Sequence, residues 1–111
     1  MGIVLAAQSE PVPLVRDTTA RAADAAVNLV PIWSCVGWGT CRVYVESDVA
    51  GTLSIWQKER NGTFRQTNSQ AIAAATGTPV EATIVGERIR IRYVNGSTIQ
   101  ARFACYASLM P

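Results

Sequence analysis

Strict alternation of apolar and polar residues marks the last part of the chain. Two alternating runs lie between residues 87 and 109, separated by the turn-forming Asn95-Gly96-Ser97. Their apolar faces comprise Ile89, Ile91 and Tyr93 in the first run and Ile99, Ala101, Phe103, Cys105 and Ala107 in the second. Alternation of this kind is typical of half-buried β-strands. A loop of Asn95, Gly96 and Ser97 would place Tyr93 opposite Ile99, so the pattern predicts an antiparallel hairpin.

The same alternation predicts another strand just before this hairpin. Residues 79–85 carry Val80, Ala82 and Ile84 on one face. A tight turn at Gly86-Glu87 would place Ile84 opposite Ile89. The same register would set Glu81 opposite Arg92 as a cross-strand ion pair. We therefore expect a meander of consecutive strands at the end of the domain.

Residues 41–46 and 51–58 also alternate, with Val43 and Val45 inward in the first segment and Leu53 and Ile55 inward in the second. The turn at residues 47–51 predicts that these two segments form a hairpin. In that register Arg42 would stack on Trp56 on the outer side of the sheet.

Residues 25–32 and 63–67 are two further expected strands, and residues 69–76 are expected to form a strand or loop on the surface.

These short strands, separated by frequent turn signals, predict an all-β fold. We expect an antiparallel β-sandwich or jelly-roll-like barrel of roughly six to eight strands. The 111 residues are enough for one domain. Residues 25–111 are assigned to the sandwich. Residues 1–24 are assigned to an extended N-terminal arm, because Pro11 and Pro13 favour extended backbone and cannot donate backbone hydrogen bonds.

The predicted arm carries more apolar side chains than a solvated tail would need. They are Ile3, Val4, Leu5, Val12, Leu14 and Val15. Two interpretations remain open: the arm packs on its own domain, or it lies on a neighbouring subunit. The apolar run at residues 3–7 is too short for a signal sequence, and no run approaches the ~20 apolar residues of a membrane span. No membrane partner is therefore expected.

The residue types argue against catalysis and against a bound metal. The chain has no His, its Asp and Glu residues are scattered, and it has no glycine-rich phosphate loop. Its Cys count is odd, and Cys35 and Cys41 fit no zinc-binding spacing. We expect no enzymatic activity and no cofactor, with Cys35, Cys41 and Cys105 reduced, as in a reducing compartment.

A row of basic side chains lies opposite the apolar face of the run that begins at residue 87. It comprises Arg88, Arg90 and Arg92, and Tyr106 is the one aromatic residue expected near it. With a net charge of only +2, the row is interpreted as a solvated face, and nucleic-acid binding is not expected. Trp33 and Trp38 flank a corner, where they are expected either to seal the core or to face a partner.

Three stretches of this sequence resemble turn and pairing motifs of a known protein group. They are Val43–Ile55 with its Ser-Asp-Val-Ala-Gly-Thr-Leu turn, the Asn61-Gly62 turn, and Arg88–Gly96 following Gly86. The chain over about residues 41–107 resembles the small β-sandwich proteins of tailed-bacteriophage virions, which include head decoration or cement proteins and head–tail or tail-surface components.

The resemblance implies a structural part of a virion that is assembled in the host cytoplasm. A capsid decoration or cement protein would bind the major capsid protein or other virion proteins through the arm, and it would self-associate as a homo-oligomer. Trp33, Trp38 and the Arg row would be secondary contacts. Two alternatives are a tail, head–tail adaptor or fibre-base component, and a carbohydrate- or surface-binding module that uses Trp33, Trp38 and Trp56.

Overall fold

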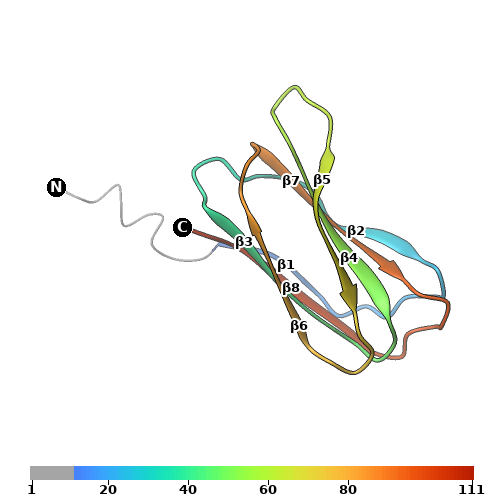
Figure 1. Cartoon of the computed structure of the whole chain (residues 1–111). Coiled ribbons are helices and arrows are strands. Elements are labelled where there is room, and N and C mark those ends of the chain that lie inside the picture. The colour runs from blue at the N-terminus through green and yellow to red at the C-terminus, as the bar shows by residue number, and fades with distance from the viewer. Residues whose placement is uncertain (1–11) are drawn as a thin grey trace.

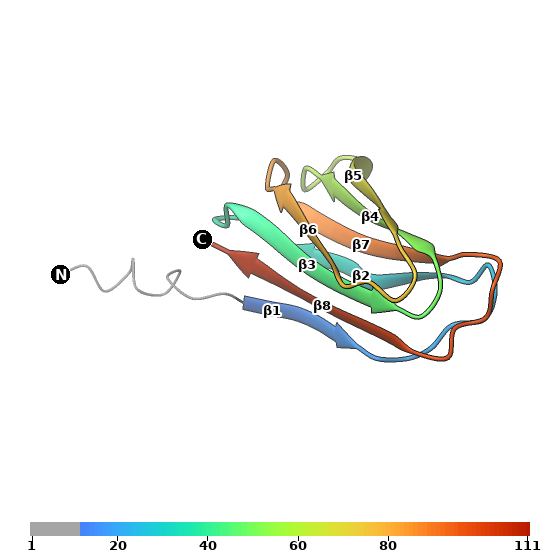
Figure 2. The ribbon, with the colours of Figure 1, turned by 60° about the horizontal axis from the view of Figure 1, so that its bottom comes forward.

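Two four-stranded antiparallel sheets pack face to face in the computed structural model, which describes residues 12–111 (Figure 1). The strands are β1 (Val12–Asp17), β2 (Ala26–Ser34), β3 (Thr40–Ser47), β4 (Gly51–Lys58), β5 (Arg65–Ile72), β6 (Thr78–Thr83), β7 (Arg88–Asn95) and β8 (Phe103–Met110). Sheet A has the order β1-β8-β3-β6, and sheet B has the order β2-β7-β4-β5. Figure 2 shows the two layers. The predicted all-β sandwich is confirmed.

The pairing of strands explains why the sandwich is a jelly roll. β1 pairs with β8, β2 with β7, β3 with β6, and β4 with β5. The chain is therefore one long antiparallel ribbon that has been rolled over, with β3–β8 and β4–β7 pairs completing the two sheets. Rolling the ribbon places successive parts of it in opposite layers, which is the eight-stranded jelly-roll arrangement.

Alternate residues of both sheets form the core, as the sequence pattern predicted. The fully buried side chains include Val43 and Val45 of β3, Leu53 and Ile55 of β4, Ile89, Ile91 and Tyr93 of β7, and Cys105 and Leu109 of β8. Tyr93 and Phe103 pack with ring centroids 4.8 Å apart and planes tilted by 53°. Each strand thus buries one face and leaves the other face available on the outside of the sandwich. No helix long and apolar enough to cross a membrane occurs among residues 12–111.

The predicted meander at the end of the chain is wrong. β7 pairs with β2 and β4 rather than with β6 or β8, so Tyr93 lies opposite Val27 and Leu53 instead of Ile99. Residues 84–87 and 96–102 cross from one sheet to the other instead of forming tight hairpins. Because of this crossing, Ile99 is 68% exposed.

The predicted cross-strand partners of Arg92 and Trp56 are also wrong, because the strands concerned lie in different sheets. Glu81 on β6 faces Arg42 on β3, with Arg42 Nε 2.8 Å from Glu81 Oε2. Trp56 on β4 lies opposite Arg90 on β7. The expected hairpin of residues 41–46 and 51–58 does not form, since β3 belongs to sheet A and β4 to sheet B.

The described part of the predicted arm is a strand of the sandwich. Val12 pairs with Leu109 and Val15 with Ala107, with a β-bulge between Pro13 and Val15. An edge strand tolerates Pro13 because one side of the strand needs no backbone donor. The sandwich therefore begins at Val12 rather than at residue 25, and residues 12–17 pack on their own domain. Residues 1–11 lie outside the described residues.

A buried glutamine on β4 joins β5, β6 and the β6–β7 connection at one end of the sandwich. Gln57, which is 3% exposed, donates from Nε2 to Thr67 Oγ1 at 3.1 Å and to the Thr83 carbonyl at 3.0 Å. Its Oε1 accepts the Val85 and Gly86 backbone N–H groups at 2.8 and 3.0 Å. One buried amide thereby links β4 to β5, to the end of β6 and to the β6–β7 connection, and its own donors and acceptor are satisfied.

Replacing Gln57 with Ala is expected to destabilise the fold by about 2 to 4 kcal/mol, because buried donors and acceptors lose their partner and a cavity remains. Chemical denaturation monitored by circular dichroism measures this change. Gln66→Ala is the matched control, since Gln66 is exposed on neighbouring β5. Equal stabilities of the two variants would contradict the role assigned to the Gln57 amide.

All three thiols lie inside the sandwich, which makes their reactivity a test of the fold. Cys35, Cys41 and Cys105 are free and fully buried. Burial raises the pKa of the Cys41 and Cys105 thiols to about 12, and it also raises the pKa of Cys35. Because the thiolate is the reactive species, we expect no reaction of the native protein with a chromogenic disulfide reagent at neutral pH. Denaturant should release the three thiols, whereas rapid labelling of the native protein would contradict this core.

Candidate partner-binding surfaces

The apolar residues assigned to partner binding in the arm fall into two groups. Val12, Leu14 and Val15 lie on β1, where they are half-buried and pack against the core of their own domain. Ile3, Val4 and Leu5 lie outside the described residues. Any contact that β1 makes with a partner therefore uses only the parts of these side chains that the core leaves exposed.

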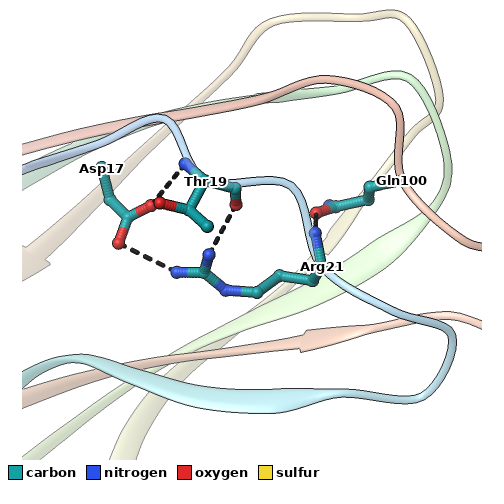
Figure 3. A network of polar contacts seen from close by, with 4 residues as sticks. All are labelled: Asp17, Thr19, Arg21 and Gln100. Atoms are coloured by element: carbon teal, nitrogen blue, oxygen red, sulfur yellow. Dashed lines mark hydrogen bonds and ion pairs between the residues drawn. The ribbon is translucent and has the colours of Figure 1, made fainter.

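A polar network holds the end of β1 to the rest of the sandwich (Figure 3). Asp17 Oδ2 lies 2.9 Å from Arg21 Nη2, and Asp17 Oδ1 accepts the Thr19 backbone N–H at 2.9 Å. Arg21 Nη1 also donates to the Thr19 carbonyl at 2.6 Å, and the guanidinium lies 5.6 Å from the centre of the Phe103 ring. These contacts fix the turn that carries the chain from sheet A to sheet B.

Gln100 connects this turn with both sheets. Its Oε1 accepts the Arg21 backbone N–H at 2.8 Å, and its backbone N–H donates to the Arg21 carbonyl at 2.9 Å. Its Nε2 donates to Ser47 Oγ at 2.9 Å and to Tyr93 Oη at 3.2 Å. The alternation placed Ile99 and Ala101 inward and so Gln100 outward, but the Gln100 side chain is 5% exposed, because the chain is crossing between layers at this point. Hydrogen bonds thus tie the turn after β1 to both sheets.

An open pocket of about 580 Å³ lies beside this network, between the β3–β4 and β7–β8 connections. Asp48 lines it and accepts the backbone N–H groups of Arg102 at 3.2 Å and Ala101 at 3.0 Å. These two donors lower the pKa of the Asp48 carboxyl. Within residues 12–111, no group of three or more His, Cys, Asp and Glu side chains is arranged to hold a metal ion. Through its hydrogen bonds to Ala101 and Arg102, the Asp48 carboxylate ties the β3–β4 connection to the β7–β8 connection.

The Arg row lies on the outer face of sheet B, as the alternation predicted. Arg88, Arg90 and Arg92 are on β7, which has β2 on one side and β4 on the other. Trp56 of β4 lies opposite Arg90, and Lys58 lies opposite Arg88. The sheet therefore adds a fourth basic residue and an aromatic residue to a row that the sequence suggested only on one strand.

Sequence reasoning missed Phe64 on this face. Phe64 packs there, with Arg90 Cζ 4.1 Å and Lys58 Nζ 5.1 Å from the ring centre. Tyr106, the residue expected near the row, lies instead on sheet A, where Arg16 Cζ is 5.6 Å from its ring. The alternation did show that Trp56 points outward. The missing information was that β4 pairs with β7.

Exposed apolar side chains gather at the end of the sandwich where β2 ends. Ile32 and Val36 are each 51% exposed, Trp33 is 46% exposed, and Val85 is 67% exposed. The Cys35 backbone N–H donates to the Glu87 carbonyl at 3.0 Å, which brings the β2–β3 and β6–β7 connections together. We call Ile32, Trp33, Val36 and Val85 the apolar end. Single exposed apolar residues are ordinary, but a group of this kind is typical of contact sites.

The three tryptophans do not share one platform. Trp33 is in register with inward-facing Ile89, whereas Trp56 is in register with outward-facing Arg90. Trp38 is half-buried and packs against the core. Stacking on a sugar ring requires an open aromatic face, so this arrangement argues against the carbohydrate-binding alternative.

The Asp48 contacts predict a contribution to acid sensitivity. A carboxyl whose pKa is lowered by folding stabilises the protein above its unfolded pKa of about 4, and this stabilisation is lost as pH falls through the folded pKa. The free energy of unfolding should therefore fall less steeply with decreasing pH in Asp48→Asn than in the unmodified chain. Denaturation curves between about pH 6 and pH 2 measure this slope. Asp24→Asn is the control, because Asp24 is exposed at the same end, and identical slopes for Asp48→Asn and the unmodified chain would contradict the prediction.

Several solved structures share this architecture. The PBSX exported protein XepA superposes with a TM-score of 0.79 and 23% identity, over 93% of this chain and 37% of the XepA chain. The SPBc2 prophage-derived protein YomS superposes with a TM-score of 0.54 and 9% identity, over 90% of this chain and 94% of YomS. The VP2 subviral particle of infectious bursal disease virus gives a TM-score of 0.53 and 11% identity, over 90% of this chain and 31% of that chain. At such identities the likeness shows a common fold.

The sequence itself matches one family. No curated protein is matched. The family model described as "Uncharacterised protein YqxG N-terminal domain" matches residues 36–110, which is more than half of the chain and runs from the turn before β3 to the end of β8. This chain therefore belongs to the YqxG N-terminal domain family.

Proposed function

We propose that this chain is a non-enzymatic virion structural protein of the capsid decoration or cement type. The jelly roll supports a structural role, because it also forms part of the VP2 subviral particle, and YomS is prophage-derived. A fold of this kind hosts many functions, so the function of this chain depends on the residues of its surfaces.

One observation carries the proposal: the first strand, β1, begins at the end of the sandwich where the residues of the apolar end are exposed. Val12 pairs with Leu109, next to Met110, whose carbonyl accepts the Gly39 backbone N–H at 3.0 Å. We propose that the apolar residues Ile3, Val4 and Leu5, which precede β1 in the sequence, and the apolar end together supply the area that a partner buries.

The proposed mechanism is mechanical. Apolar contacts bury surface at about 25 cal/mol per Å², and a shell offers the same contact many times. Because the chain would bind the assembled shell better than its separate subunits, binding would shift the equilibrium toward assembly. The partner would be the major capsid protein or another virion protein. Self-association into a symmetric homo-oligomer would multiply the contacts further.

Deletion of residues 1–11 tests this proposal without removing β1. We expect the truncated chain to keep its fold and to bind purified virus particles that lack this chain at least about tenfold more weakly, since apolar contacts are lost. Co-sedimentation measures the affinity, and thermal disruption of the particles measures shell stabilisation.

Trp33→Ala is a second variant, and Gln70→Ala, on an exposed position of β5, is the matched control. The proposal is wrong if neither the deletion nor Trp33→Ala changes the affinity for the particles. Binding to isolated tails but not to heads would favour the tail, adaptor or fibre-base alternative.

A further inference from the structure

The outer face of sheet B is basic along its two central strands, β7 and β4. In register on this face are Ala26 and Asn28 of β2, Arg88, Arg90, Arg92 and Val94 of β7, Thr52, Ser54, Trp56 and Lys58 of β4, and Gln66, Ser69 and Ala71 of β5. These positions hold four cationic side chains and no acidic one. We call this surface the basic face.

The basic face differs in charge from the opposite side of the sandwich. On the outer face of sheet A, Arg42 is paired with Glu81, and the Tyr44 hydroxyl donates to Glu46. Near the basic face, Glu87 is bound to the Arg60 backbone N–H at 2.8 Å. Within residues 12–111, the four strands of sheet B carry no Asp or Glu, so the cations of this face have no carboxylate on their own strands.

Two guanidinium groups of the basic face are already held in place. Arg90 donates from Nε to the Pro31 carbonyl at 3.0 Å and stacks on Phe64. Arg88 donates from Nη1 to the Glu87 carbonyl at 3.1 Å and to Ser34 Oγ at 3.5 Å. Fixed side chains lose little conformational entropy when they bind, so these groups are prepared for a ligand.

We infer that the basic face is where this chain docks an acidic protein surface, and this inference rests on the proposed virion role. Guanidinium groups bind planar carboxylates through two parallel hydrogen bonds. Alternate residues of a strand are about 6.8 Å apart, so the three arginines of β7 form a row about 14 Å long. Carboxylates on alternate residues of an extended partner segment have the same spacing.

The aromatic residues favour a protein partner over single-stranded nucleic acid. Proteins that bind single strands offer open aromatic faces on which bases stack. Here Arg90 and Lys58 pack on the Phe64 ring. Trp56 is half-buried, and its Nε1 donates to Ser54 Oγ at 2.9 Å. The rings of this face support the cations and leave little surface for stacking.

The basic face also continues into the apolar end. Ser34, which follows Trp33, lies opposite Arg88 on the neighbouring strand. A partner that buries Trp33 would therefore bring its own surface close to the first guanidinium of the row. Apolar contact would supply affinity, while charge complementarity would set orientation and speed of association.

Charge reversal tests the basic face. The double variant Arg88→Glu/Arg92→Glu is compared with Arg16→Glu/Arg102→Glu, which changes net charge equally at exposed positions outside the face. Three probes are used: purified particles lacking this chain, a peptide of alternating Glu and Thr, and a single-stranded oligothymidylate. We expect the first variant to lose at least about tenfold in affinity for the particles and the peptide, and the control to change by about twofold or less. Circular dichroism checks folding, and Arg88→Gln/Arg92→Gln repeats the test if the reversal disturbs the fold.

The outcomes separate this inference from the proposed function. Equal binding of both double variants to the particles would contradict docking through the basic face, while the proposed virion role would be unaffected. Tighter binding of oligothymidylate than of the acidic peptide would contradict an acidic protein partner and favour nucleic acid. If the unmodified chain does not bind the particles, the proposed virion role is wrong. The inference about the basic face is then wrong as well, unless the unmodified chain binds the acidic peptide and only Arg88→Glu/Arg92→Glu loses that binding.

Discussion

The structure depends on one constraint: every strand has one apolar face, and all these faces must be buried against each other. A single sheet cannot do this, because its apolar side would face water. The ribbon formed by β1–β8, β2–β7, β3–β6 and β4–β5 solves the problem by rolling into two layers. Val43 and Val45 of one sheet then face the same core as Ile89 and Ile91 of the other.

Rolling the ribbon makes the chain cross between layers at both ends of the sandwich, and these crossings contain backbone groups that need partners. Two buried glutamines provide them. Gln57 accepts and donates at the β6–β7 crossing, while Gln100 joins the turn after β1 to Ser47 and Tyr93. Buried amides with satisfied donors and acceptors specify one arrangement of the loops, because a shifted loop would leave them without partners. The apolar core thus holds the two sheets together, while the buried amides hold the crossings in one arrangement.

The same constraint determines which surfaces are available for function. Since the inward faces are buried, the outward faces and the crossings are what a partner meets. Strand order places Trp56 beside Arg90 and Lys58 beside Arg88, and the hydrogen bond from Cys35 to Glu87 joins the connections that carry Val36 and Val85. A basic face and an apolar end therefore adjoin each other on a scaffold that is fixed by its core. Such a scaffold can present a flat contact surface with little loss of conformational entropy on binding.

The sequence alone predicted most strands and their inward faces, because side-chain direction in a strand repeats every two residues and can be read from neighbours along the chain. The exception is the stretch before Phe103, which crosses between the sheets and exposes Ile99. The alternation thereby gave the outward Arg88, Arg90 and Arg92, the inward Val43 and Tyr93, and the all-β class. Strand partners were decided only by the tertiary structure. Pairing joins segments far apart in sequence, and many registers keep the apolar faces together equally well, so Glu81 found Arg42 instead of Arg92 and Phe64 came to lie beneath Arg90.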